Sequence, residues 1–209
     1  MSAHRLTGSS LHVFRGERHV LRGLSFAVES GEYLEVTGSN GAGKTSLLRT
    51  IVGLVHAESG RVEWNGQGIH QDARAYHAQL AWLGHESPLK ADLTPAENLH
   101  FAIGIRRKVG SDQVAQALIE VGATDFADRP VRTLSAGQRR RVALAGVVLA
   151  AVPLWVLDEP STHLDAAGQE LVGQLIQRQV DAGGIVVAAV HAPLPVAEAG
   201  TRRLGLSSK

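Results

Sequence analysis

The fold of this 209-residue chain is decided by one segment, Gly38-Ser39-Asn40-Gly41-Ala42-Gly43-Lys44-Thr45. The β-rich residues 33–37 before it predict a strand, and the residues from Lys44 to a glycine at position 53 predict a helix. Glycines let successive backbone N–H groups turn toward an anion, and the N-terminus of the following helix adds positive potential. We therefore predict a phosphate-binding loop of the Walker A type at this strand-to-helix turn.

Each polar side chain of the loop has an expected task. Lys44 would reach the β- and γ-phosphates of a nucleoside triphosphate, the Thr45 hydroxyl would bind Mg²⁺, and Ser46 completes the same ATP-binding segment. We expect Lys44 to lie on an exposed loop, so that its removal spares the core. The alternative is a glycine-rich turn with a solvated lysine, which leaves the flanking strand and helix unexplained.

A second acidic element comes later in the chain. The apolar run 154–157 predicts a buried strand that ends in two carboxylates, Asp158 and Glu159. Asp158 would hold Mg²⁺ together with Thr45, and Glu159 would polarise an attacking water. The alternative is a pair of surface carboxylates where a strand leaves for a loop. A GTPase would need an Asn/Thr-Lys-x-Asp segment to read guanine, and the sequence contains none.

Alternation of β-rich and helical segments indicates the α/β class. The apolar runs 154–157 and 185–190 are typical of central parallel strands buried on both faces. The first 30 residues predict an antiparallel β addition, and capping patterns at Thr94, Ser111 and Ser135 predict three helix starts. We expect one domain over residues 1–209: a P-loop NTPase with a mostly parallel sheet, an N-terminal antiparallel β subdomain and a helical subdomain at about 85–150.

Composition narrows the class of partner. Lys and Arg number 21 against 20 Asp and Glu, so we expect no nucleic-acid partner. The basic clusters at 106–108 and 139–141 are expected to form solvated or nucleotide-facing surfaces. The absence of cysteine excludes disulfides and thiolate metal sites. Residues 142–157 carry no charge but are too few to span a bilayer, so we expect a buried helix end and a buried strand, with no transmembrane segment.

One further motif resembles that of a known family. The segment Leu134-Ser135-Ala136-Gly137-Gln138 is similar to the signature of ABC-type ATPases, with Ala136 in place of the usual first glycine. Walker A, signature, acidic strand and a later histidine follow the family's order over nearly the whole chain. The resemblance implies an ABC ATPase that hydrolyses ATP with Mg²⁺. It also implies a homodimer on ATP binding, in which Ser135 and Gly137 of one chain face the γ-phosphate held by the other.

Other positions correspond to those of the family one by one. Asp165 falls in the D-loop, and His191 falls where a switch histidine contacts the γ-phosphate. His85 occupies the Q-loop position in place of the usual glutamine, which would contact Mg²⁺ or the attacking water. Phe14 is either the aromatic that stacks on adenine or a core aromatic of the β subdomain, because stacking and burial look alike in sequence.

Several variants, among them residues 82–85 and 97–101, resemble one branch of the family, the ATP-binding subunits of bacterial cytochrome c maturation, described as haem exporters. This resemblance implies a peripheral protein on the cytoplasmic side of the inner membrane. It would drive a separate, CcmB-like integral membrane permease that docks on residues 85–133. The alternatives are an ATPase subunit of another ABC transporter with a different substrate, a soluble non-transport ABC ATPase, and a phosphate-binding module without turnover.

Overall fold

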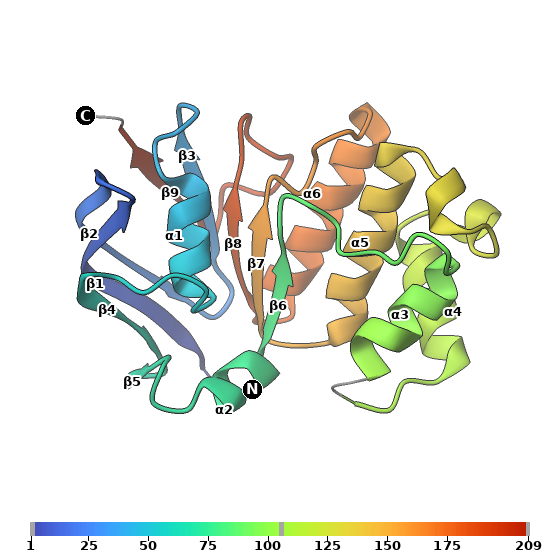
Figure 1. Cartoon of the computed structure of the whole chain (residues 1–209), viewed down its shortest axis with the longest axis horizontal. Coiled ribbons are helices and arrows are strands. Elements are labelled where there is room, and N and C mark those ends of the chain that lie inside the picture. Colours follow the sequence, from blue (N-terminus) through green and yellow to red (C-terminus); the bar gives the residue numbers. More distant parts are fainter. Residues whose placement is uncertain (1–2, 105–106, 208–209) are drawn as a thin grey trace.

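Two sheets and the helices around them make up the computed structural model, which describes residues 3–104 and 107–207 (Figure 1). Arg106 of the first basic cluster lies outside the described residues. The larger sheet is parallel and has the order β6-β7-β8-β3-β9. Its strands are β3 (Tyr33–Gly38), β6 (Leu80–Leu83), β7 (Leu154–Asp158), β8 (Ile185–Ala189) and β9 (Thr201–Leu206).

This parallel sheet separates two apolar cores, because successive side chains of a strand point to opposite faces. Leu154 and Val156 of β7 pack with the antiparallel sheet and with helix α1 (Lys44–Ile51), whereas Trp155 and Leu157 pack with the helices on the other face. Every residue of β7 and β8 is buried. The prediction of central parallel strands covered on both faces is therefore confirmed.

The predicted antiparallel β addition is present but larger than expected. β1 (Arg5–Arg15) pairs with β2 (Arg18–Glu29) on one side and with β4 (Ser59–Trp64) on the other, and β4 pairs with β5 (Gln67–Gly68). Strands β4 and β5 follow α1 in the sequence, yet they belong to the same sheet as the first 30 residues. Only Val62 and Trp64 of β4 are buried, so its apolar pattern was too weak to indicate a strand.

The remaining helices include a group at the end of the molecule opposite the antiparallel sheet (Figure 1). That group comprises α3 (Pro95–Gly104), α4 (Ser111–Glu120) and α5 (Ala136–Ala150), with 3₁₀ turns at Thr124–Phe126 and Val131–Thr133. Helix α6 (Ala166–Asp181) packs on the same face of the parallel sheet, whereas α2 (Ala73–Ala78) packs in the core shared with the antiparallel sheet. The start of α3 is confirmed, since the Glu97 N–H donates to the Thr94 hydroxyl over 3.2 Å and the Thr94 N–H donates to the Glu97 carboxylate over 2.8 Å. Residues 142–157 are the end of α5 and the strand β7, as predicted. Among the described residues, no helix combines the length and apolarity needed to cross a bilayer.

Candidate functional site

The glycine-rich loop joins β3 to α1 in a conformation that requires its glycines. Gly38, Gly41 and Gly43 have φ values of 146°, 79° and 105°, which side chains rarely adopt. A Cβ at Gly38 would also clash with the carbonyl oxygen of Leu206 in β9. The sequence therefore forms a tight loop whose last glycine precedes the first turn of α1, which leaves the unpaired N–H groups of that turn available to an anion.

Lys44 is buried, contrary to the expectation of an exposed loop lysine. Lys44 is only 6% exposed, and its Nζ donates to the Gly38 carbonyl over 2.7 Å. The loop wraps around the ammonium group, because Lys44 begins α1 and its side chain returns toward the preceding turn. A positive charge thus lies inside the loop, where it can bind a phosphate.

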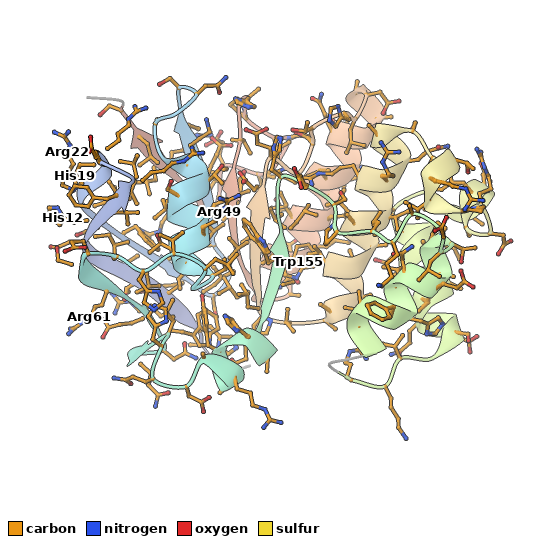
Figure 2. The ribbon with its side chains drawn as sticks, viewed as in Figure 1. His12, His19, Arg22, Arg49, Arg61 and Trp155 are labelled. Atoms are coloured by element: carbon orange, nitrogen blue, oxygen red, sulfur yellow. The ribbon has the colours of Figure 1, made fainter. Side chains whose placement is uncertain are left out.

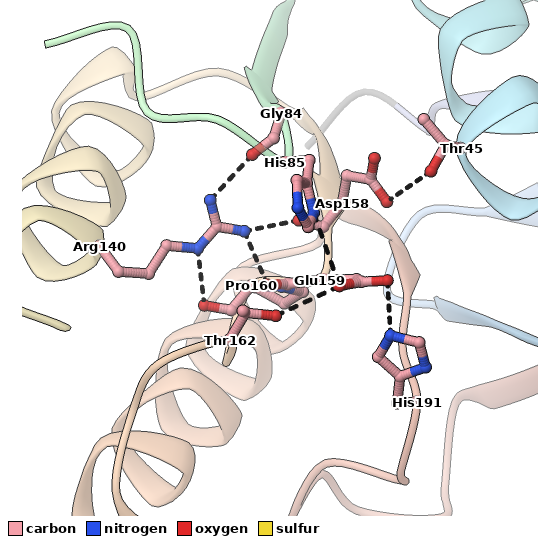
Figure 3. A network of polar contacts seen from close by, with 9 residues as sticks. All are labelled: Thr45, Gly84, His85, Arg140, Asp158, Glu159, Pro160, Thr162 and His191. Atoms are coloured by element: carbon pink, nitrogen blue, oxygen red, sulfur yellow. Dashed lines mark hydrogen bonds and ion pairs between the residues drawn. The ribbon is translucent and has the colours of Figure 1, made fainter. Parts of the chain in front are cut away.

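The second acidic element lies beside the loop, as Figure 3 shows. The Thr45 hydroxyl donates to Asp158 Oδ1 over 3.3 Å, although the two residues are far apart in sequence. Asp158 is 1% exposed, and its Oδ2 has no hydrogen-bond partner among the described residues. Burial raises the pKa of Asp158, the bond from Thr45 opposes this, and the nearby Glu159 carboxylate adds to the rise. A buried carboxylate oxygen without a donor, next to a hydroxyl, suits a divalent cation that prefers oxygen ligands.

Glu159 lies between two histidines from different loops (Figure 3). Its Oε1 is 2.7 Å from His191 Nε2, and its Oε2 is 3.6 Å from His85 Nδ1. The Thr162 hydroxyl donates to Oε2 over 3.3 Å. Both imidazoles are more than half exposed, while the Glu159 side chain is 17% exposed. The fold therefore brings together the carboxylate and both histidines that the sequence singled out.

The signature segment forms the N-terminus of α5 with the predicted capping box. The Ser135 hydroxyl accepts from the Gln138 N–H over 3.2 Å, and the Gln138 side chain accepts from the Ser135 N–H over 2.9 Å. A Cβ at Gly137 would lie 2.7 Å from the carbonyl oxygen of His163, so glycine also serves packing within this chain. Leu134 is buried, whereas Ser135 and Ala136 face solvent. The exposed part of the segment is free to contact a ligand or a second chain.

The signature helix and the phosphate loop belong to opposite faces of the parallel sheet. Apolar residues of α1 pack in the core shared with the antiparallel sheet, and those of α5 pack in the other core. The next segment, at Asp165, caps α6: its carboxylate accepts from the Gly168 N–H over 2.9 Å and is 76% exposed. Asp165 therefore has a structural role in this chain as well as its predicted place in the D-loop.

Phe14 is not a core residue. It is 46% exposed, and its ring stacks on the imidazole of His19 at 4.2 Å between centroids. Phe14 lies near the end of β1, next to the turn between β1 and β2 and beyond the part of the strand that packs on the core. His19, labelled in Figure 2, also lines a hollow of about 380 Å³ shared with Gly41 and Ala42 of the phosphate loop. Of the two readings of Phe14 from the sequence, the core aromatic is wrong.

Arg140 is a functional candidate that was not evident from the sequence, where the cluster 139–141 is expected to form a solvated or nucleotide-facing surface. Arg140 is instead 3% exposed. Burial lowers its pKa to about 10, and the charges of Asp158 and Glu159 partly oppose the shift. The sequence does contain a signal for the burial of Arg140, because Arg140 precedes the buried Leu144 and Val147 by four and seven residues, the spacing of one helix face.

The chain is similar to known proteins over most of its length. A family model described as ABC transporter matches residues 21–162. The Escherichia coli (strain K12) protein named "Cytochrome c biogenesis ATP-binding export protein CcmA" is 46% identical over 193 residues, which cover 92% of each chain. The Shigella flexneri protein of that name is equally similar, at 46% over 92% of each chain.

Solved structures show the same fold. A putative ABC transporter ATP-binding protein from Pyrococcus furiosus aligns with a TM-score of 0.85 at 25% identity, over 97% of each chain. A dimeric ATP-binding cassette in a post-hydrolysis state, bound to ADP and Pi, aligns with a TM-score of 0.81. That alignment covers 90% of this chain and 88% of the other at 20% identity, which shows the fold alone.

Proposed function

This chain belongs to the ABC transporter family as an ATP-binding and ATP-hydrolysing subunit, and on that premise we propose that it energises an export step of cytochrome c biogenesis. The observation that carries the proposal is the 46% identity, over 92% of the chain, to an export protein of that process. Because a c-type cytochrome carries covalently attached haem, haem is the cargo that we assign to the system.

The site performs hydrolysis through charge and positioning. Lys44 and the N–H groups of its loop bind the β- and γ-phosphates. Thr45 and Asp158 would hold Mg²⁺, which supplies further charge neutralisation on the phosphate oxygens when bound. Glu159 orients the attacking water, and His191, at 2.7 Å from its Oε1, fixes the direction of the carboxylate. Phe14 and the neighbouring hollow offer an exposed ring on which adenine can stack.

Two chains are needed to complete the site. The signature and the phosphate loop lie on helices at opposite faces of one sheet, so a single chain cannot close Ser135 and Gly137 over its own γ-phosphate. A homodimer in which each signature faces the partner's nucleotide satisfies both segments. ATP then holds the dimer together, and hydrolysis opens it.

The membrane partner docks on an apolar surface next to the Q-loop, in our proposal. Two adjacent hollows share Trp82 and Pro88 in their walls; one extends to Phe101 of α3, and the other to His85. Phe101 is 51% exposed despite its size. This surface includes part of the stretch 85–133, on which the permease is expected to dock. A permease bound there would hold the chain, peripherally, at the cytoplasmic face of the inner membrane.

A charge on this surface is expected to prevent docking. In Phe101→Asp, a carboxylate replaces the exposed ring, and burying it against an apolar partner costs several kcal/mol. The variant should be absent from the membrane fraction of cells that contain the permease, whereas the ATPase rate of the isolated chain should stay unchanged. Ile119→Asp is the matched control, because Ile119 is 57% exposed on α4 and does not line either hollow. Equal membrane binding by the two variants would contradict this docking surface.

The proposed function itself is tested by deletion of the gene in its own host. Covalent haem in c-type cytochromes, detected by haem-dependent peroxidase staining of denaturing gels, should disappear. A plasmid carrying the parent sequence should restore it, and the same plasmid with Lys44→Ala should not. Normal cytochromes c after deletion would assign the chain to another ABC transporter or to a soluble ABC ATPase, which the polypeptide that co-purifies with it would distinguish.

A further inference from the structure

Arg140 points its guanidinium at the backbone of the turn around Glu159 (Figure 3). Its Nε donates to the Pro160 carbonyl over 3.2 Å, and its Nη1 donates to the Gly84 carbonyl over 2.8 Å. Its Nη2 donates to the carbonyls of Asp158 over 2.5 Å and of Glu159 over 2.7 Å. One buried side chain of the signature helix thus binds three successive carbonyls of the turn around Glu159 and one carbonyl of the Q-loop.

These carbonyls belong to the Q-loop and to the turn around Glu159, and the side chains of His85 and Glu159 from these two segments lie next to each other. Gly84 directly precedes His85, which lies 3.6 Å from Glu159 Oε2. Glu159 itself has a φ of 51°, a left-handed conformation that side-chain residues adopt at a cost unless their surroundings hold them there. With the turn in this conformation, its three carbonyls converge on Arg140.

The bonding pattern differs from that of a stabilising ion pair. Arg140 hydrogen-bonds to backbone carbonyls alone among the described residues, so exchanging any contacted side chain would leave these bonds in place. A planar guanidinium offers five N–H donors in a fixed fork, whereas a lysine offers donors from a single atom. Only arginine can reach the Q-loop and the turn at the same time.

We propose that Arg140 is a positioning residue for ATP hydrolysis: it holds the Q-loop and the Glu159 turn as one unit, so that the carboxylate stays between His85 and His191. Arg140 touches neither nucleotide nor water in this role; it acts through the backbone of Glu159. This inference rests on the proposed ATPase function. It assigns His85 a specific task as well, since an imidazole at this position reaches the carboxylate only if Gly84 is held.

The test is steady-state ATP hydrolysis by the full-length chain in the variants Arg140→Lys and Arg140→Met. We expect kcat to fall on the order of 10²-fold with methionine, as for a misplaced reacting group, and less with lysine. The affinity for ATP, measured by direct titration, should change by less than about threefold, because Lys44 and Thr45 are untouched. A loss confined to kcat is the signature of positioning, whereas general loosening of the fold would weaken ATP binding too.

A double-mutant cycle with His85→Ala supplies the second readout. If Arg140 acts by holding His85 against Glu159, removal of the imidazole should reduce kcat in the parent but have little further effect in Arg140→Lys. Arg107→Met is the matched control, since Arg107 is also a partly buried arginine that binds a backbone carbonyl. Its guanidinium donates to the carbonyl of Leu149, which lies in α5 like Arg140 but away from Glu159. That variant should retain the parent kcat.

Each outcome decides the proposal. Parent kcat in Arg140→Lys and Arg140→Met, additive effects with His85→Ala, or loss of ATP binding in step with kcat would overturn it. A chain that does not fold even with lysine at this position would also overturn it, because Arg140 would then stabilise the fold rather than position Glu159. The proposed ATPase function is judged separately, by hydrolysis in the parent and its absence in Lys44→Ala.

Discussion

Glu159→Gln is expected to bind ATP normally but to hydrolyse it on the order of 10² times more slowly, or worse, the range typical of losing a general base. The amide keeps the shape of the side chain but cannot accept a proton from the attacking water. Lys44, Thr45 and Asp158 remain in place, so nucleotide binding should persist. If hydrolysis opens the proposed sandwich of two chains, the variant should accumulate as an ATP-bound dimer. Light scattering with and without ATP measures this directly.

The control for this substitution is Glu170→Gln, which makes the same chemical change at an exposed position of α6. It should hydrolyse ATP at the parent rate and show no dimer trapping. A Glu159→Gln protein that stays monomeric in saturating ATP, or that turns ATP over as fast as the parent, would remove Glu159 from the mechanism.

Lys44→Ala should abolish ATP turnover, because the loop loses the one ammonium group that it encloses. The buried position adds a second expectation. The Gly38 carbonyl loses a 2.7 Å hydrogen bond, so the free energy of unfolding should fall by about 1 kcal/mol. Since ATP binding is weakened, the variant should also remain monomeric at ATP concentrations that trap Glu159→Gln. Phosphate release, nucleotide titration and thermal unfolding measure the three effects.

Lys108→Ala is the matched control, because Lys108 is exposed and lies outside the phosphate loop. It should change neither turnover nor stability. If Lys44→Ala retained turnover, or unfolded many degrees below the parent, Lys44 would be a structural lysine rather than a phosphate ligand.

The parts of this protein that the sequence predicted are those in which local rules act. The phosphate loop follows from glycines that relieve backbone strain between a strand and a helix. The helix starts at Thr94 and Ser135 follow from capping residues placed three positions before Glu97 and Gln138. The buried strands β7 and β8 follow from unbroken apolar runs. Each of these signals lies within a few residues of the chain, so it can be recognised without knowledge of distant neighbours.

The tertiary structure alone decided which polar side chains are buried and what they contact. Lys44 is buried because its own loop folds back over the ammonium group, and Arg140 is buried because the Q-loop and the turn around Glu159, both distant in sequence, close around it. Phe14 is exposed because the end of β1 extends past the apolar core on which the rest of the strand packs. Burial and hydrogen bonding depend on segments brought together across the sheet, and sequence spacing carries no measure of that approach. The side chains that meet at the site were thus evident from the sequence, whereas the support that holds Glu159 in place was not.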